Sequence, residues 1–90
     1  MNVYKFNVTG KVQGVFYRKT IQQMGAMGQI QGYVKNLEDG SVEVVAFLYD
    51  DIFEDFMNIL KNGSSKSEVK DIKHEILEED DLIYDGFEIR

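Results

Sequence analysis

Apolar and polar residues alternate near the start of the chain with the period of a β-strand. Tyr4, Phe6 and Val8 are separated by Lys5 and Asn7. Successive side chains of a strand point to opposite faces, so this alternation places the three apolar residues on one side. We therefore expect a first strand with one buried face and one face in solvent.

The spacing of the apolar residues changes to that of a helix after residue 16. Tyr17, Ile21, Met24 and Gly28 share one helical face. Glycine is less favourable than alanine in a helix by about 1 kcal/mol, and two glycines stand near the end of this segment. The pattern predicts a helix that ends near residues 27–28.

A hairpin is indicated between residues 30 and 48. Ile30 to Lys35 is expected to form a second strand, and Ser41 to Leu48 a third. Between them lies Leu37-Glu38-Asp39-Gly40, in which Asp-Gly supplies the positive φ that a hairpin turn needs. The second and third strands should therefore be antiparallel.

A second apolar stripe predicts a helix from about Asp51 to Lys61. Asp51 and Glu54 have the spacing of a capping box, and Asp55 adds negative charge at the positive end of the helix dipole. Asn62-Gly63 is expected to end the helix. The residues of the stripe are Ile52, Phe53, Phe56, Ile59 and Leu60.

The remaining residues predict two more strands. Apolar residues alternate imperfectly over residues 69–76, which indicates a fourth strand containing a bulge. Residues 78–81 are expected to form an acidic turn, and residues 83–89 a short final strand with Phe87 pointing inward.

The predicted element order is β-α-β-β-α-β with one extra strand. It favours an α+β fold, the ferredoxin-like α/β sandwich, with two helices on one face of an antiparallel sheet.

Composition limits the classes of protein to consider. The chain has 90 residues, which is the size of one domain covering residues 1–90. It has no cysteine and a single histidine, His74, so a metal site built from these residues is not expected. No stretch approaches the roughly 20 apolar residues of a membrane span, and no signal peptide is recognisable. We expect a soluble, cytoplasmic protein without a metal.

Charge is divided unevenly along the chain. Residues 1–36 contain five basic residues and no acid, whereas all sixteen acids and the other five bases follow. The net charge of −6 opposes binding to a polyanion such as RNA. The third strand also lacks the pattern of aromatic and basic residues that an RNA-binding sheet requires. An anion site is still possible in the first part of the chain, because the carboxylates lie elsewhere in the sequence.

The stretch between the first strand and the first helix has the features of such an anion site. Backbone N–H groups at a helix start lack intrahelical partners and point outward, where the helix dipole is positive. Gly10 and Gly14 allow a tight turn and a close approach of the ligand. Arg18 and Lys19 place two cations at this end, and Arg18 has the planar donor geometry that suits phosphate.

Two motifs carry a resemblance to the acylphosphatase family. The first signature of that family is similar to Gly10-Lys11-Val12-Gln13-Gly14-Val15-Phe16-Tyr17-Arg18. The second is similar to Gly32-Tyr33-Val34-Lys35-Asn36, continuing through Gly40 to Val42. The closing strand of the family resembles Phe87-Glu88-Ile89, so the likeness spans nearly the whole chain.

The resemblance implies an enzyme that hydrolyses the carboxyl-phosphate bond of acyl phosphates. It implies that backbone N–H groups and an arginine hold the phosphate, that an asparagine orients the attacking water, and that neither a metal nor an organic cofactor is needed. Taken alone, Asn36 would be interpreted as the residue that begins a turn. The residues implied for phosphate are Gln13, Gly14, Val15, Phe16, Tyr17 and Arg18, and those implied for catalysis are Arg18 and Asn36.

An alternative from another class is a non-catalytic anion-binding or regulatory module on the same scaffold, because this fold supports many functions. Turnover of an acyl phosphate distinguishes the two, since a binding module would only be occupied. The expected partner is a small acyl phosphate, with no nucleic acid and no membrane, and the chain is expected to act as a monomer.

Overall fold

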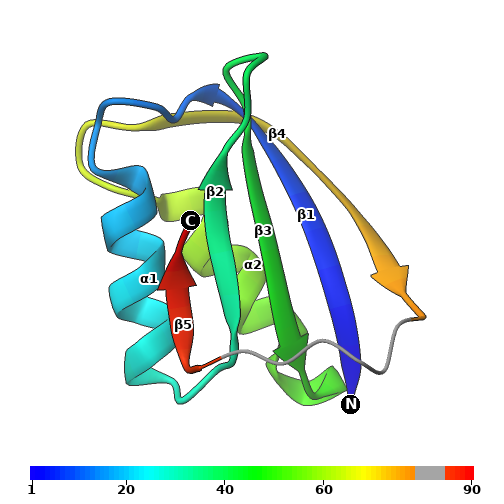
Figure 1. The fold of residues 1–90 in the computed structure, drawn as a ribbon. Helices are drawn as coiled ribbons and strands as arrows, with labels where there is room; N and C mark the ends of the chain where they lie inside the picture. The colour runs from blue at the N-terminus through cyan, green and yellow to red at the C-terminus, as the bar shows by residue number, and fades with distance from the viewer. Residues whose placement is uncertain (79–84) are drawn as a thin grey trace.

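The computed structural model describes residues 1–78 and 85–90, and in this part of the chain two α-helices lie on one face of a five-stranded sheet (Figure 1). One layer of helices and one layer of sheet are thus present, as the helical and alternating patterns of the sequence predicted. The elements are β1 (Asn2–Lys11), α1 (Tyr17–Met27), β2 (Gly32–Asn36), β3 (Val42–Leu48), a 3-10 turn (Asp50–Ile52), α2 (Phe53–Asn62), β4 (Glu68–Leu77) and β5 (Phe87–Ile89).

The strand order in the sheet is β4-β1-β3-β2-β5. β1 is antiparallel to β3 and β4, and β2 is antiparallel to β3, as expected for the ferredoxin-like arrangement. The expectation of a wholly antiparallel sheet is wrong, because β5 runs parallel to β2, with Gly32 opposite Phe87 and Val34 opposite Ile89. An apolar alternation predicts a strand but contains no information on its partner or direction. The sheet is therefore mixed.

The apolar face of the sheet forms the core beneath the helices. Phe6 and Val8 of β1 are fully buried and Tyr4 is 8 % exposed, as their alternation predicted. The facing residues of β3 repeat the same period. They are Val42, Val44, Ala46 and Leu48.

The buried face of α1 differs in part from the predicted one. Tyr17 and Ile21 are buried as expected, but Met24 is 39 % exposed, Gly28 is also exposed, and Gly25 is buried instead. The buried residues of α1 therefore follow one another in steps of four, from Tyr17 through Ile21 to Gly25. Gly25 is buried because the ring of Phe87 fills the space beside it. A Cβ atom at Gly25 would lie 2.5 Å from Cδ2 of that ring. The absence of a side chain therefore lets α1 approach β5 closely.

The second helix begins later than predicted. A 3-10 turn precedes it, and α2 begins at Phe53 with Ile52 as the N-cap and without a side-chain hydrogen bond to the cap. The expected capping box is therefore wrong, because the 3-10 turn places Asp51 inside a helical turn. Acidic residues still occupy the first turn, and Phe56 and Leu60 of the predicted stripe are fully buried.

The last two strands agree with the pattern only in part. The predicted bulge is present, since Thr9 lies opposite Asp71 and Gly10 opposite Val69, which leaves Lys70 unpaired in register. The final strand is shorter than predicted and contains only residues 87–89, with Phe87 buried as expected. Residues 79–84, which include most of the predicted acidic turn and the predicted start of this strand, lie outside the described residues.

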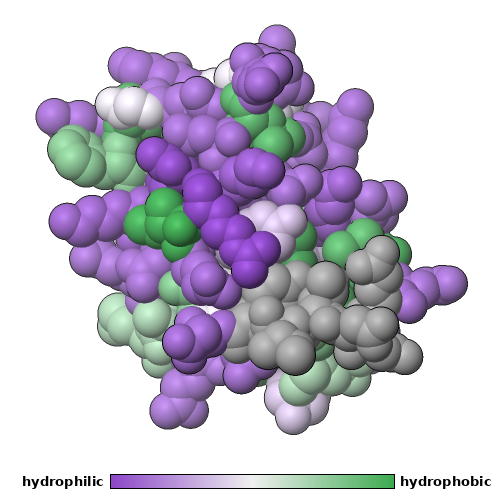
Figure 2. Space-filling model, in the orientation of Figure 1, coloured by the Kyte–Doolittle hydropathy of each residue, from purple (hydrophilic) through white to green (hydrophobic). Residues whose placement is uncertain are grey.

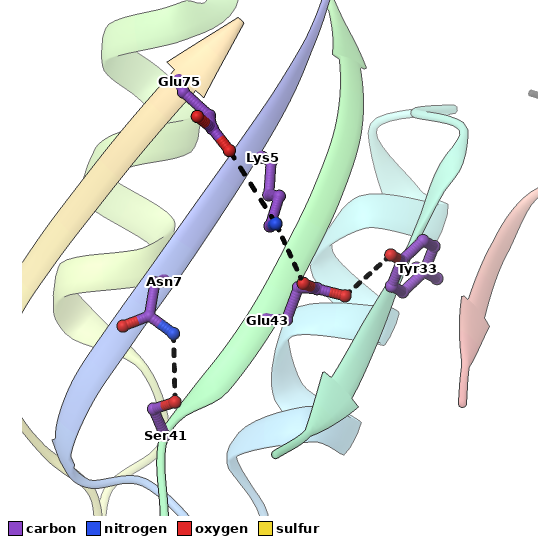
Figure 3. Close-up of polar contacts among 6 residues, drawn as sticks. All are labelled: Lys5, Asn7, Tyr33, Ser41, Glu43 and Glu75. Carbon is purple, nitrogen blue, oxygen red and sulfur yellow. Dashed lines mark hydrogen bonds and ion pairs between the residues drawn. The ribbon is translucent and has the colours of Figure 1, made fainter. Parts of the chain in front are cut away.

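The face of the sheet away from the helices is largely polar (Figure 2), but it also carries a second apolar cluster formed by Val3 and Val45, with Tyr33, Phe47 and Leu77 packed against it. Lys5 lies 3.6 Å from a carboxylate oxygen of Glu43 and 3.8 Å from one of Glu75. The Tyr33 hydroxyl donates a hydrogen bond of 2.8 Å to Glu43, so this network crosses four neighbouring strands (Figure 3). It occupies the solvent-facing side that the alternation in β1 predicted.

Candidate active site

One end of the sheet brings together the loop between β1 and α1, the end of β2 and the end of β5 (Figure 1). A cavity of about 290 Å³ lies there. It collects residues that are far apart in the sequence and that include five of the predicted site residues. The residues lining it are Val12, Gly14, Phe16, Tyr17, Arg18, Lys19, Asn36 and Ile89.

The loop presents its backbone N–H groups at the start of α1. Gly14 and Phe16 both have positive φ values, 72° and 63°, which turn the chain sharply before the helix begins at Tyr17. Among the hydrogen bonds of the described residues, none is donated by a backbone N–H from Gly14 to Lys19. No acidic residue occupies the first turn of the helix. These N–H groups are therefore available to an anion.

Two cations border the same cavity from the first turn of α1. Arg18 and Lys19 both line it, and Nη1 of Arg18 donates a hydrogen bond of 3.3 Å to the carbonyl of Arg90. This exposed contact uses one N–H group of the Arg18 guanidinium and leaves the others for a ligand. Cations at the positive end of a helix are unfavourable by roughly 0.3–1 kcal/mol each, and a bound anion would offset this.

The helix that carries these groups is fixed by a buried tyrosine. Tyr17 is 1 % exposed, and its hydroxyl donates a hydrogen bond of 2.8 Å to the carbonyl of Leu60 near the end of α2. Burial raises the pKa of this phenol, so Tyr17 stays neutral and donates. Its role in the site is to fix the first turn of α1 against the second helix.

Asn36 approaches the cavity from the end of β2. It lies two residues after the buried Val34, so its side chain points to the face of the sheet that the helices cover. Its Oδ1 is buried, and it is the one such side-chain polar atom in the described residues without a hydrogen-bond partner. Leaving a buried acceptor unpaired costs about 1–3 kcal/mol. Asn36 lines the cavity, so a rotation of its side-chain amide would expose Oδ1 to a hydrogen bond from water or a ligand there.

The side chain of Gln13 points away from the cavity and toward the turn between β2 and β3. Its Nε2 donates hydrogen bonds of 2.8 Å to the carbonyl of Leu37 and 2.9 Å to the carbonyl of Ser41. Val15 also lies outside the cavity lining: its side chain is buried, and its carbonyl accepts a hydrogen bond from the Ser64 hydroxyl. For these two residues, the prediction of phosphate binding therefore rests on their backbone N–H groups alone.

The turn between β2 and β3 is also stabilised by hydrogen bonds within it. The hydroxyl and the backbone N–H of Ser41 donate hydrogen bonds of 2.6 Å and 2.9 Å to Oδ1 of Asp39. Hydrogen bonding by the Ser41 hydroxyl, with a further contribution from its N–H, lowers the pKa of the Asp39 carboxyl. Asn7 donates a hydrogen bond of 3.0 Å to the same hydroxyl from β1 (Figure 3).

Comparison with known proteins identifies the family. The family model described as Acylphosphatase matches residues 4–89. The chain belongs to the acylphosphatase family. An acylphosphatase of Borrelia garinii subsp. bavariensis is 38 % identical over 76 residues, which cover 83 % of this chain and 82 % of that protein. An acylphosphatase of Haloarcula marismortui is 39 % identical over 83 residues, 92 % of this chain and 89 % of that protein.

A solved acylphosphatase structure has the same fold. The crystal structure of acylphosphatase from Bacillus subtilis superimposes with a TM-score of 0.90 at 33 % identity, covering 100 % of this chain and 99 % of that chain. The resemblance inferred from the two sequence motifs is thus confirmed, and with it the predicted class of enzyme. The ferredoxin-like fold is confirmed by the same comparison.

Three residues that line the cavity of this acylphosphatase-family chain were not among those predicted for phosphate binding or catalysis. Lys19 was predicted only as a second cation at the anion site, because it follows Arg18 in the same first helical turn. Val12 and Ile89 had no such signal, since an isolated apolar residue in a strand or loop is usually a core residue. Ile89 reaches the cavity because β5 pairs with β2, and that pairing is not readable from the sequence.

Apolar surface adjoins the cationic part of the cavity. Phe16 is 67 % exposed and Ile89 is 46 % exposed, although both are large apolar residues. Nζ of Lys66 lies 6.0 Å from the centre of the Phe16 ring. The cavity therefore has a cationic side suited to phosphate and an apolar rim.

Within residues 1–78 and 85–90, no group of three or more histidine, cysteine, aspartate or glutamate residues could hold a metal ion. The described helices are likewise too short and too polar to cross a membrane.

Proposed function

We propose that this member of the acylphosphatase family hydrolyses the carboxyl-phosphate bond of acyl phosphates, releasing a carboxylate and inorganic phosphate, at the cavity beside α1. The observation that carries the proposal is the unpaired, buried Oδ1 of Asn36 in the same cavity as Arg18. An unpaired buried acceptor is unfavourable, and Oδ1 would become paired if the amide of Asn36 turned toward a water molecule bound beside the substrate.

The phosphoryl group would be bound by the loop and by the first turn of α1. The free N–H groups from Gly14 to Tyr17, together with that of Gln13, would face its oxygens, and Arg18 would donate charge-assisted hydrogen bonds. These donors are fixed before the substrate binds and therefore need little reorganisation as negative charge develops in the transition state. Phosphoryl transfer depends mainly on such positioning and charge stabilisation.

Asn36 would orient the attacking water. Its carbonyl oxygen can accept a hydrogen bond from water but is too weak a base to remove a proton, so the proton would pass to a phosphoryl oxygen of the substrate. The water oxygen forms a bond to phosphorus while the bond from phosphorus to the acyl oxygen breaks. The departing group is a carboxylate, a good leaving group that needs no strong general acid. This agrees with a cavity lining that contains no carboxylate, histidine or cysteine among the described residues.

The acyl group would extend along the apolar rim. With the phosphoryl group beside the cations, the rest of the substrate would pass Phe16 and Ile89, whose exposed side chains line the same cavity. Contact with this rim would stabilise an aromatic acyl group more than an acetyl group, because more apolar surface is removed from water. We further infer catalysis without a metal by a cytoplasmic monomer.

A turnover assay tests the proposal against a non-catalytic anion-binding module. Benzoyl phosphate and acetyl phosphate are incubated with the protein after exhaustive chelation, and the released phosphate is measured. Sustained turnover of either substrate supports the enzyme. Binding without turnover would favour the module, and turnover that returns only with added magnesium would contradict the metal-free mechanism.

A further inference from the structure

We propose that the Gln13 side chain is a positioning residue that fixes the turn carrying Asn36 relative to the phosphate loop. This inference rests on the proposed function of the cavity. It assigns to Gln13 a second role in addition to any contact between its backbone N–H and phosphate. The observation that carries it is the pair of hydrogen bonds from Nε2 to the carbonyls of Leu37 and Ser41.

The two carbonyls that Gln13 contacts stand at the base of the turn. The N–H of Leu37 donates a hydrogen bond of 2.9 Å to the carbonyl of Ser41, and the N–H of Gly40 donates one of 3.2 Å to the carbonyl of Leu37. The side-chain amide of Gln13 has two N–H groups, and the two carbonyls use both. One side chain therefore connects the loop to both ends of the turn at once.

Asn36 immediately precedes this turn, and its own Oδ1 has no partner in the described structure. Its orientation therefore depends on the backbone on either side of it. On the β2 side the ladder with β3 fixes that backbone, with Asn36 opposite Val42. On the turn side the contact from Gln13 to Leu37 fixes it against the loop. A displacement of about 1 Å between reacting groups can lower a rate about 10²-fold.

Other contacts of the turn do not connect it to the phosphate loop. Asn7 reaches the Ser41 hydroxyl from the middle of β1 (Figure 3), and Asp39 accepts a hydrogen bond from Ser41 within the turn. These contacts stabilise the shape of the turn but do not fix its distance from the phosphate loop. Among these side-chain contacts, those of Gln13 alone join the loop to the turn.

The test uses Gln13→Met, which keeps the length and removes both donors, with Gln22→Met as the matched control. Gln22 donates a hydrogen bond of 3.2 Å to the carbonyl of Phe87 and has no contact with the turn. For Gln13→Met we expect kcat for benzoyl phosphate to fall at least about tenfold, while the inhibition constant of inorganic phosphate changes less than about twofold, since the loop N–H groups remain. Gln22→Met should retain normal kcat.

A double-mutant cycle with Asn36→Ala shows whether Gln13 acts through Asn36. In the Asn36→Ala background, Gln13→Met should reduce the remaining kcat no further. The inference is overturned if kcat of Gln13→Met equals that of the unaltered protein, if the loss is the same in both backgrounds, or if phosphate binding weakens in proportion to kcat. If the unaltered protein turns over neither substrate, the proposed function fails and this inference fails with it.

Gln13→Glu provides an independent readout if Gln13→Met does not fold. An ionised carboxylate facing two carbonyls cannot donate and repels them, whereas a protonated carboxyl can donate one hydrogen bond. Burial and the carbonyls disfavour the charged form and raise the pKa of the new group. Relative to the unaltered protein, kcat of Gln13→Glu should therefore recover as the pH is lowered through that pKa. A constant ratio across the pH range would overturn the inference.

Discussion

Arg18 and Asn36 line one cavity, although one lies in the first turn of α1 and the other at the end of β2. Arg18 contributes fixed positive charge and several donors, whereas Asn36 contributes a buried, unpaired acceptor. In the proposed mechanism, Arg18 would bind the substrate phosphate and Asn36 would orient the attacking water. Removing each side chain should therefore impair substrate binding and turnover in a different way.

Arg18→Ala should weaken binding and slow the reaction together, because the guanidinium would contact the phosphoryl group in both the substrate and the transition state. Charge-assisted hydrogen bonds are worth about 1.5–3 kcal/mol each, and removing a preorganised donor can lower the rate roughly 10²–10³-fold. Arg18→Lys should restore little, because an ammonium cannot reproduce the planar donor geometry. Steady-state kinetics and phosphate inhibition measure both effects. Normal phosphate inhibition in Arg18→Ala would contradict the assignment.

Asn36→Ala should lower kcat severely and leave phosphate binding nearly unchanged. Water orientation matters on the way to the transition state, so its loss affects kcat more than the affinity for a ground-state anion. Circular dichroism should first show that the variant is folded. Removing an unpaired buried oxygen should also not destabilise the fold strongly. A folded variant that retains most of its turnover would exclude the water-orienting role.

Inorganic phosphate should compete with the substrate and raise the melting temperature. It matches the free N–H groups of the loop and the charge of Arg18. At 100 times its dissociation constant, a ligand that binds only the folded state stabilises it by about 2.7 kcal/mol. A thermal melt with and without phosphate measures the shift, and Arg18→Ala should reduce it. An unchanged melting temperature at saturating phosphate would contradict a phosphate site in this loop.

Gly25→Ala should destabilise the protein although alanine is the better helix former by about 1 kcal/mol. The added Cβ would lie 2.5 Å from the ring of Phe87, which also packs beside Phe56 with ring centres 6.3 Å apart. Overpacking of this kind costs about 1–3 kcal/mol. Gly28→Ala is the control, since its Cβ would approach Ile30 no closer than 3.4 Å. Urea unfolding of both variants measures the difference, and equal stabilities would exclude the steric explanation.

The fold could be predicted as far as local periodicity determines it. Alternation in β1 and the stripe of α2 lead directly to residues that the structure buries, such as Phe6 and Phe56. The exposure of Met24 and the burial of Gly25 could not be predicted, because they depend on Phe87, which is more than sixty residues away in the sequence. The parallel pairing of β5 with β2 could not be predicted either, because it too depends on a contact between segments far apart in the sequence.

The site was predictable where it depends on a motif. The two signatures identify Arg18 and Asn36 as candidates, and the structure brings both to one cavity. The contact between Gln13 and the turn was not predicted, since a signature does not show where a side chain points. The apolar rim also required the structure, because Ile89 joins Phe16 only through the sheet pairing.

The exposed rim leads to a prediction about the acyl group. Phe16→Asn removes the aromatic surface and keeps a residue that tolerates the left-handed backbone conformation at this position, where φ is 63°. Benzoyl phosphate should lose about fivefold in kcat/KM, which corresponds to roughly 1 kcal/mol of apolar contact on a half-exposed surface. Acetyl phosphate should change less than about twofold, because its methyl group presents little surface to the ring.

Two controls separate the contact with the acyl group from a general disturbance of the loop. Met27→Asn replaces an apolar side chain that is 78 % exposed and lies outside the cavity lining, so both substrates should keep their rates. Inhibition by inorganic phosphate should be unchanged in Phe16→Asn, because the N–H groups of the loop remain in place. Equal losses for benzoyl and acetyl phosphate, with weaker phosphate inhibition, would instead mean that Phe16 maintains the loop and does not contact the acyl group.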